Sequence, residues 1–308
     1  MLNAVRRDLL SDSNNLTAGV DQSDRQFASD DHPRPAICDW KILELEGVGF
    51  SYNPSTPTIE SIALNIDRGS LVGFVGPSGS GKTTTIDVIM GLLPPENGSL
   101  EFVTPDGRPT DVGDRTQMFA YVPQESAILD ASIAENIAFG IPSELIDSER
   151  VDAAIRDAGL LHVVERLPDG PDTLLGESGK GLSVGERQRV GIARALYRDA
   201  PIIVLDEPTA AQDAENEADI MSVIEGLRGS KTVIAIAHRV NSLKKFDKIF
   251  LFESGRIVNE GSFSHLMSTE PRFSKLVEHF AGTDTEPPPL TEPSSGATTL
   301  QSPGGSAP

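Results

Sequence analysis

The sequence predicts an α/β fold with a parallel-sheet core, an N-terminal antiparallel β subdomain and an inserted α-helical subdomain. Residues 71–75, 201–207 and 231–238 contain short, nearly continuous apolar runs, as expected for parallel strands that are covered on both faces. Residues 43–46 and 60–66 instead alternate apolar with polar side chains. That alternation is typical of antiparallel strands with one solvated face.

The remaining elements follow in chain order. Behind the strand at 71–75, apolar residues at helical spacing predict a helix that runs to Leu93 and stops at the prolines that follow. An apolar stripe within residues 148–160 indicates a helix of the inserted subdomain, which we place at about 125–200. Residues 248–261 predict a hairpin that turns at Ser254 and Gly255.

Composition limits the class of protein. The 308 residues carry 26 basic and 46 acidic side chains, a net charge of −20, which argues against a protein that mainly covers nucleic-acid phosphates. The single cysteine, Cys38, excludes an internal disulfide and a multi-cysteine metal site, so we expect a reducing compartment. We find no apolar run of membrane-spanning length and no signal peptide, and therefore expect a soluble chain.

Both ends of the chain are poor in apolar residues and rich in Ser, Thr, Asp, Gly and Pro. Such segments bury too little surface to offset the entropy of chain ordering. We therefore expect disordered segments at 1–35 and 281–308 and one folded unit at 36–280.

The stretch GPSGSGKTTT fits the nucleotide-binding pattern G-x-x-x-x-G-K-[ST] and stands between the predicted strand and helix, as that pattern requires. Its glycines allow successive N–H groups to surround a phosphate, and the helix start favours an anion. Lys82 can bridge the outer phosphates and the Thr83 hydroxyl can ligate Mg²⁺. The alternative is a flexible glycine turn with a solvated lysine. The candidate phosphate-binding residues are Gly76, Pro77, Ser78, Gly79, Ser80, Gly81, Lys82, Thr83 and Thr84.

Polar residues at the ends of two further strands complete the expected site. Asp206 can reach a Mg²⁺ held at the neighbouring loop, and Glu207 can polarise a water for attack on the γ-phosphate. His238 should lie at the same sheet edge, where it can bind the γ-phosphate and orient that water. Taken singly, each would be interpreted as a solvated residue at a strand end.

A second helix start also suits a phosphate. In LSVGE, Ser183 is a good N-cap, and Ser183 and Gly185 offer N–H groups at the start of an Arg-rich helix. One glycine loop with two phosphate-binding helix starts suggests that two copies share each nucleotide.

The order of these motifs resembles the ATP-binding cassette of ABC transporters, over roughly residues 40–270. The resemblance matches the glycine loop to Walker A, LSVGERQR to the signature and IIVLDE to Walker B. It implies a Q-loop role in catalysis and Mg²⁺ binding for Gln124, a D-loop position for Asp213, an H-loop position for His238 and adenine stacking for Tyr52. The other interpretation of Tyr52 is an aromatic residue at a strand edge. The implied fold is a P-loop NTPase cassette, and the implied cofactors are ATP and Mg²⁺.

Details of the motifs are similar to the exporter branch, and among it to half-transporters that flip lipids or lipid-linked glycans. The resemblance therefore implies an ATPase that drives transmembrane transport, with a second cassette and a transmembrane subunit as partners and no nucleic acid. We expect the chain to lie at the cytoplasmic face of the cell membrane, held there by its membrane partner. We find no counterpart of the family's six-helix membrane domain in this sequence, and expect it either on a separate chain or lost by truncation.

Two departures from the family pattern leave alternatives open. Val184 and Glu186 replace a glycine and a glutamine of the usual signature, and the D-loop is TAAQD where exporters commonly have TSALD. A non-hydrolysing or truncated ATP-binding module is one alternative. A soluble ABC ATPase that acts on DNA or ribosomes is another, although coiled-coil insertions, tandem cassettes and zinc modules are missing from the sequence.

Overall fold

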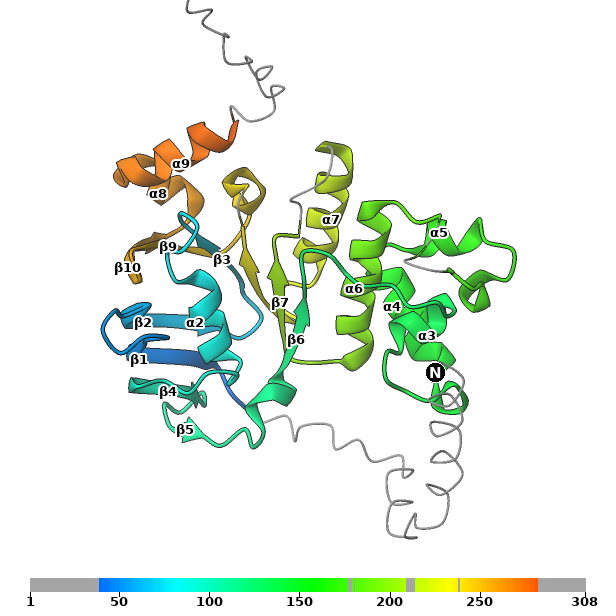
Figure 1. Ribbon diagram of the computed structural model, residues 1–308, viewed down its shortest axis with the longest axis horizontal. Coiled ribbons are helices and arrows are strands. Elements are labelled where there is room, and N and C mark those ends of the chain that lie inside the picture. Colours follow the sequence, from blue (N-terminus) through cyan, green and yellow to red (C-terminus); the bar gives the residue numbers. More distant parts are fainter. Residues whose placement is uncertain (1–38, 177–178, 180, 209–213, 238, 282–308) are drawn as a thin grey trace, which may run out of the picture.

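The computed structural model describes residues 39–176, 179, 181–208, 214–237 and 239–281. The expected disordered segments lie almost entirely outside these ranges, so they stay a prediction. The described chain forms two β-sheets and a group of helices at one side of the larger sheet (Figure 1).

The smaller sheet is antiparallel and has the strand order β2-β1-β4-β5. It confirms the predicted N-terminal β subdomain, and it adds β4 and β5, which the sequence pattern did not predict. Its strands are β1 (Ile42–Phe50), β2 (Ile59–Asp67), β4 (Asn97–Val103) and β5 (Pro109–Thr110).

The larger sheet has the order β10-β9-β3-β8-β7-β6. Strands β9, β3, β8, β7 and β6 pair in parallel, whereas β10 pairs antiparallel with β9 and forms the predicted hairpin. The strand before the glycine loop, β3, therefore lies beside β8 and close to β7, although these strands are distant in sequence. The six strands are β3 (Leu71–Val75), β6 (Phe119–Val122), β7 (Ile202–Asp206), β8 (Thr232–Ile236), β9 (Lys248–Glu253) and β10 (Arg256–Gly261).

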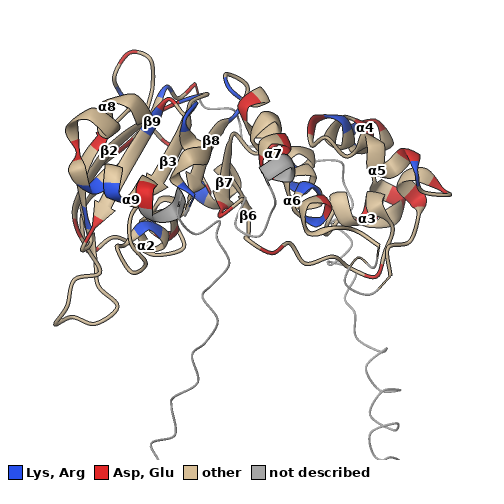
Figure 2. Cartoon of the chain, turned by 90° about the horizontal axis from the view of Figure 1, so that it is seen from above, with Lys and Arg blue, Asp and Glu red and all other residues tan. Residues whose placement is uncertain are grey.

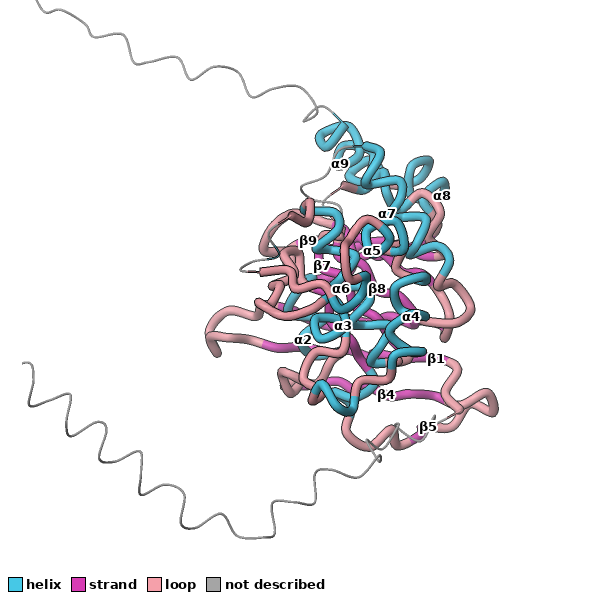
Figure 3. Tube along the Cα trace, turned by 90° about the vertical axis from the view of Figure 1, so that its right-hand side faces the viewer, coloured by secondary structure: helices cyan, strands magenta, loops and turns pink. Residues whose placement is uncertain are grey.

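The helices fall into separate groups. Helix α2 packs near β3, helices α3 to α6 lie beyond β6, α7 lies between β7 and α6, and α8 and α9 lie at the end opposite β4 and β5 (Figures 1, 2 and 3). The α-helices are α2 (Lys82–Ile89), α3 (Ile133–Ile137), α4 (Ser148–Asp157), α5 (Leu161–Glu165), α6 (Val184–Arg198), α7 (Ala214–Gly226), α8 (Phe263–Thr269) and α9 (Pro271–Ala281). Short 3₁₀ helices are η3 (Arg115–Met118), η4 (Ser143–Leu145), η5 (Gly170–Asp172) and η7 (Val240–Leu243).

Helix α2 ends four residues before the predicted end at Leu93. Gly91 adopts a left-handed conformation with φ of 80°, and the N–H groups of Leu92 and Leu93 both donate to the carbonyl of Asp87. A left-handed glycine of this kind is a common helix terminator. Local backbone chemistry therefore stops the helix before the prolines do.

The core has two layers, one on each face of the larger sheet. Along β3, Leu71 and Val75 face one apolar cluster, whereas Val72 and Phe74 face the other. The same alternation holds along β7 and β8. Burial on both faces explains the continuous apolar runs in the sequence. In the part of the chain that the structure describes, we find no helix with the length and apolar character needed to cross a membrane.

Candidate functional site

The glycine loop connects β3 to α2 at the carboxyl edge of the larger sheet. Gly76 and Gly81 have φ of 146° and 98°, and both are sterically required. A Cβ atom on Gly76 would lie 2.2 Å from the carbonyl oxygen of Phe252, and one on Gly81 would lie 2.7 Å from a methyl group of Ile59. The loop is therefore built as a close-packed backbone turn rather than as a loose glycine segment.

The ammonium group of Lys82 lies inside this loop. It donates hydrogen bonds to the carbonyl oxygens of Gly76 and Pro77, both at 2.9 Å, and to the hydroxyl of Ser80 at 3.4 Å. Burial lowers the pKa of Lys82, while the charges of Glu207 and Asp206 oppose that shift. The loop thus holds one buried cation within range of two carboxylates.

The outer face of the loop is open. Pro77, Ser78 and Gly79 are exposed, and so is Thr83 in the first turn of α2, whereas Thr84 is buried. An exposed hydroxyl at Thr83 together with the carboxylate of Asp206 supplies the oxygen ligands that Mg²⁺ prefers. The donor set therefore fits a magnesium ion.

The two predicted acids lie at the end of β7, which is separated from β3 only by β8. Asp206 is the last residue of β7, in register with Ile236 of β8. Glu207 has a left-handed φ of 49°, and its N–H donates to the carbonyl of Ile236 at 2.9 Å. Non-glycine residues seldom adopt this conformation, and such residues cluster at functional sites.

Tyr121 is a contributor that our sequence analysis missed. Its hydroxyl donates to Oδ2 of Asp206 at 2.6 Å. Burial first, and then the hydrogen bond and negative charge of Asp206, raise the pKa of Tyr121, so that it remains a donor. The sequence did contain a signal: Tyr121 stands near the end of β6, and Asp206 ends β7, the strand that pairs with it.

Of four further predicted residues, two lie in the described chain and two lie outside it. Gln124 is exposed and stands two residues after the end of β6. Tyr52 is 64% exposed, and its ring makes an edge-to-face contact with that of Phe50, with 5.0 Å between the centroids. It lies in the segment that leads to β2, whose first residue, Ile59, packs against Gly81. His238 and Asp213 lie outside the described residues, so their places at the site remain predictions.

The second helix start is well formed but lies elsewhere. Helix α6 is on the opposite side of β6 and β7 from α2 (Figure 1). Ser183 is its N-cap and accepts a hydrogen bond from the N–H of Glu186 at 3.2 Å, while Oε2 of Glu186 accepts from the N–H of Ser183 at 2.7 Å. Gly185 is buried, and Val184 is 41% exposed. Within one chain, Ser183 and Gly185 therefore do not join the glycine loop.

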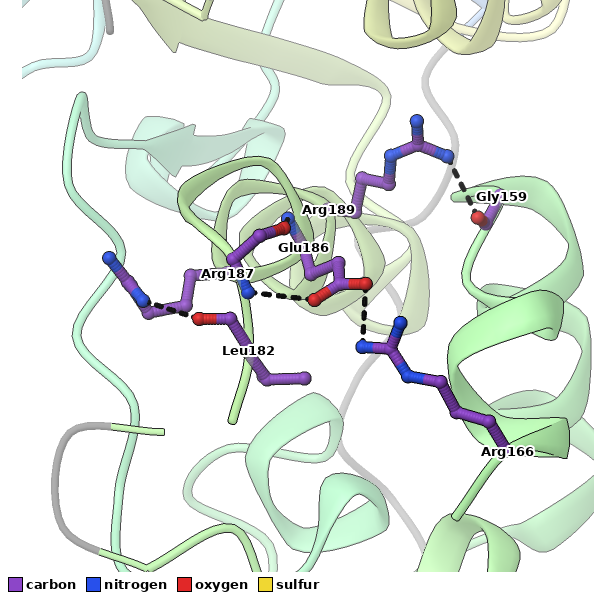
Figure 4. A network of polar contacts seen from close by, with 7 residues as sticks. Gly159, Arg166, Leu182, Glu186, Arg187 and Arg189 are labelled. Atoms are coloured by element: carbon purple, nitrogen blue, oxygen red, sulfur yellow. Dashed lines mark hydrogen bonds and ion pairs between the residues drawn. The ribbon is translucent and has the colours of Figure 1, made fainter. Parts of the chain in front are cut away.

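Arg166 closes a network at this helix start (Figure 4). Its guanidinium pairs with Oε1 of Glu186 at 2.7 Å. Burial would raise the pKa of Glu186, but the Ser183 hydrogen bonds and the Arg166 charge outweigh it, and the pKa is lowered. The acid that replaces the usual glutamine is thus ionised, and each of its two oxygens has a partner.

Comparison with known proteins agrees with this geometry. Residues 59–210 match the family model described as ABC transporter. The chain contains the ATP-binding cassette of the ABC transporter family. The predicted cassette fold is confirmed, and with it the ATPase class of the domain.

Similar proteins point to the exporter type. An ATP-dependent lipid A-core flippase of Cupriavidus metallidurans is 37% identical over 239 residues, 76% of this chain and 40% of that protein. One of Burkholderia orbicola is 39% identical over 230 residues, 73% of this chain and 38% of that protein. Among solved structures, a bacterial Atm1-family ABC exporter with ATP bound has a TM-score of 0.69 and 31% identity, covering 80% of this chain and 42% of that one. The chain thus spans about 40% of the length of the curated relatives it matches.

Proposed function

We propose that this cassette hydrolyses ATP to drive an ABC-type exporter. The observation that carries the proposal is the position of the buried Lys82 ammonium, which lies inside the glycine loop and within electrostatic range of Asp206 and Glu207. Triphosphate oxygens can replace the loop carbonyls as partners of Lys82. Backbone N–H groups of the loop and of the first turn of α2 then hold the phosphates.

Around that triphosphate each residue has a separate task. Thr83, Asp206 and Gln124 would hold Mg²⁺, which neutralises charge on the outer phosphates when bound. Glu207 accepts a proton from the attacking water, and His238 orients that water against the γ-phosphate. Tyr52 stacks on the adenine from the segment before β2.

A second cassette would complete the site. Ser183 and Gly185 would face the γ-phosphate of the other copy, because one chain does not bring its own α6 to its own loop. The resemblance to the family implies the same for Asp213. An identical chain and a different cassette would both complete the site in this way.

We further propose a transmembrane subunit that binds along the segment after Gln124. That segment includes Leu129, which is 45% exposed, and Ser132, which pairs in an isolated bridge with the 72% exposed Leu174. This partner would place the cassette at the cytoplasmic face of the membrane.

The cargo we propose is a lipid or a lipid-linked glycan. The support is the similarity to proteins named lipid A-core flippases, which are 37–39% identical over the cassette. In an exporter of this design the cassette supplies the work, while the membrane helices contact the cargo.

The function is tested by two substitutions in the full chain. Lys82→Ala should abolish ATP binding, because the buried cation that neutralises the phosphates is lost. Glu207→Gln should bind Mg-ATP, lose hydrolysis and accumulate as an ATP-dependent dimer, measured by light scattering. Lys41→Ala and Glu46→Gln, both at exposed positions, are the matched controls and should behave as wild type.

Each outcome separates the candidate functions. Unchanged ATPase activity in both Lys82→Ala and Glu207→Gln would refute the assignment. A Glu207→Gln chain that binds ATP and stays monomeric would favour the non-hydrolysing module or a heterologous partner. Mixing that chain with a cassette from a similar exporter separates those two.

A further inference from the structure

Tyr121 makes a contact that the proposed function does not use. Its phenol hydroxyl donates to Oδ2 of Asp206 at 2.6 Å, a length typical of a hydrogen bond to an ionised carboxylate. In the part of the chain that the structure describes, no other hydrogen bond to the Asp206 side chain is found. The hydroxyl therefore fixes one carboxylate oxygen and leaves Oδ1 to other partners.

The strand pairing makes this contact a consequence of the sheet. Strands β6 and β7 are parallel, with Tyr121 in register with Val204. Asp206 lies two residues beyond Val204, so the pleat places Tyr121 and Asp206 on the same face as diagonal neighbours. A tyrosine is long enough to span such a diagonal, and Tyr121 is 45% exposed on the edge strand β6.

We propose that Tyr121 is a positioning residue that orients the Asp206 carboxylate toward Mg²⁺. This inference rests on the proposed function of the glycine loop as an ATP site. Carboxylates that bind metals are commonly held by a second hydrogen bond, which fixes the orientation of the ligand before the metal arrives. Tyr121 also lies three residues before Gln124, so a displacement of that segment would reach Asp206 through the hydroxyl.

The test is Tyr121→Phe in the full chain, with the non-hydrolysable ATP analogue AMP-PNP as the probe. Its affinity is measured by calorimetry in EDTA and over a Mg²⁺ titration, and Mn²⁺ binding to the complex is followed by electron paramagnetic resonance. We expect the metal concentration for half-saturation to rise about tenfold, the usual range for loss of such a partner. Affinity in EDTA should stay within about twofold of wild type, because the hydroxyl acts through the carboxylate and not on the phosphates.

Two control variants separate the possible failures. Tyr197→Phe removes a phenol hydroxyl that accepts a hydrogen bond from Asp147 N–H at 3.1 Å in the helical subdomain, and should leave the metal dependence unchanged. Thr83→Ala removes a proposed metal ligand and should weaken metal binding. If Thr83→Ala does so while Tyr121→Phe matches Tyr197→Phe, the positioning role is wrong and the ATP site stands.

Other results also overturn the inference. Tighter metal binding by Tyr121→Phe would show that the hydroxyl competes with the ion for Asp206. An equal loss of affinity with and without metal would show a structural role for the hydroxyl. Wild-type protein that binds no nucleotide would refute the proposed function and remove the basis of this role with it.

Discussion

Glu186 is a single residue that stabilises the start of the signature helix, α6. It is buried, it stands at the third position of α6, and it exchanges hydrogen bonds with the N-cap Ser183. A carboxylate in the first turn interacts favourably with the helix dipole, and Arg166 supplies the opposite charge on its other side (Figure 4). The helix start is therefore stabilised locally before any second cassette arrives.

We expect this pair to contribute to stability. Arg166→Ala should lower the free energy of unfolding by roughly 1 kcal/mol, because it leaves a buried carboxylate without its cation while Arg166 itself is half-exposed. The double variant Arg166→Ala/Glu186→Gln should lose less than Arg166→Ala alone, since the amide carries no charge to compensate. Urea unfolding of the four chains measures this, and strictly additive losses would contradict the pairing.

The same residue predicts a pH effect. The folded chain lowers the pKa of Glu186, so its contribution is present above the unfolded pKa of about 4.3 and is lost as the pH falls through the lower, folded value. Acidification from pH 7 into that range should therefore destabilise wild type more than Glu186→Gln. Other carboxylates titrate in both chains and cancel in the difference.

At the scale of single elements, the local pattern predicted most of what was found. The buried strands, the glycine loop, the capped signature helix and the hairpin all follow from spacing and turn chemistry. The strand order β10-β9-β3-β8-β7-β6 does not, because it depends on pairings between distant segments. The Tyr121–Asp206 contact was missed for that reason, since it exists only when β6 lies beside β7.

The hairpin between β9 and β10 offers an element-scale prediction. Ser254 and Gly255 have φ of 49° and 77°, as a two-residue type I′ turn requires. Ser254→Asn should stabilise the protein by a few tenths of a kcal/mol, because asparagine favours this conformation. Gly255→Ala should destabilise it by at least about 1 kcal/mol, because the left-handed conformation is strained and the new Cβ would lie 2.6 Å from the carbonyl of Thr58.

Thermal and urea unfolding of the two hairpin variants measures these effects in the same chain. The free energy of unfolding should rise in Ser254→Asn and fall in Gly255→Ala. A neutral Gly255→Ala would contradict the close approach of the turn to Thr58, which lies on the segment beside the glycine loop.

At the scale of the whole molecule, net charge affects the association of two copies more than any single ion pair does. The chain carries a net charge of −20, although Lys and Arg are interspersed with Asp and Glu along the described chain (Figure 2). Two like-charged copies repel each other over roughly the Debye length, which is about 30 Å at 0.01 M salt and about 8 Å at 0.15 M. Closure of an ATP-bound dimer must therefore work against long-range repulsion.

This repulsion predicts that salt strengthens the dimer. Between 0.01 M and 0.15 M sodium chloride, the dimer dissociation constant of Glu207→Gln with saturating Mg-ATP should fall by roughly tenfold or more, because screening removes most of the unfavourable term. Analytical ultracentrifugation measures the constant, and nucleotide occupancy is checked at each salt concentration. A dimer that weakens as salt rises would mean that ion pairs across the interface outweigh the repulsion from net charge, since screening would then remove more attraction than repulsion.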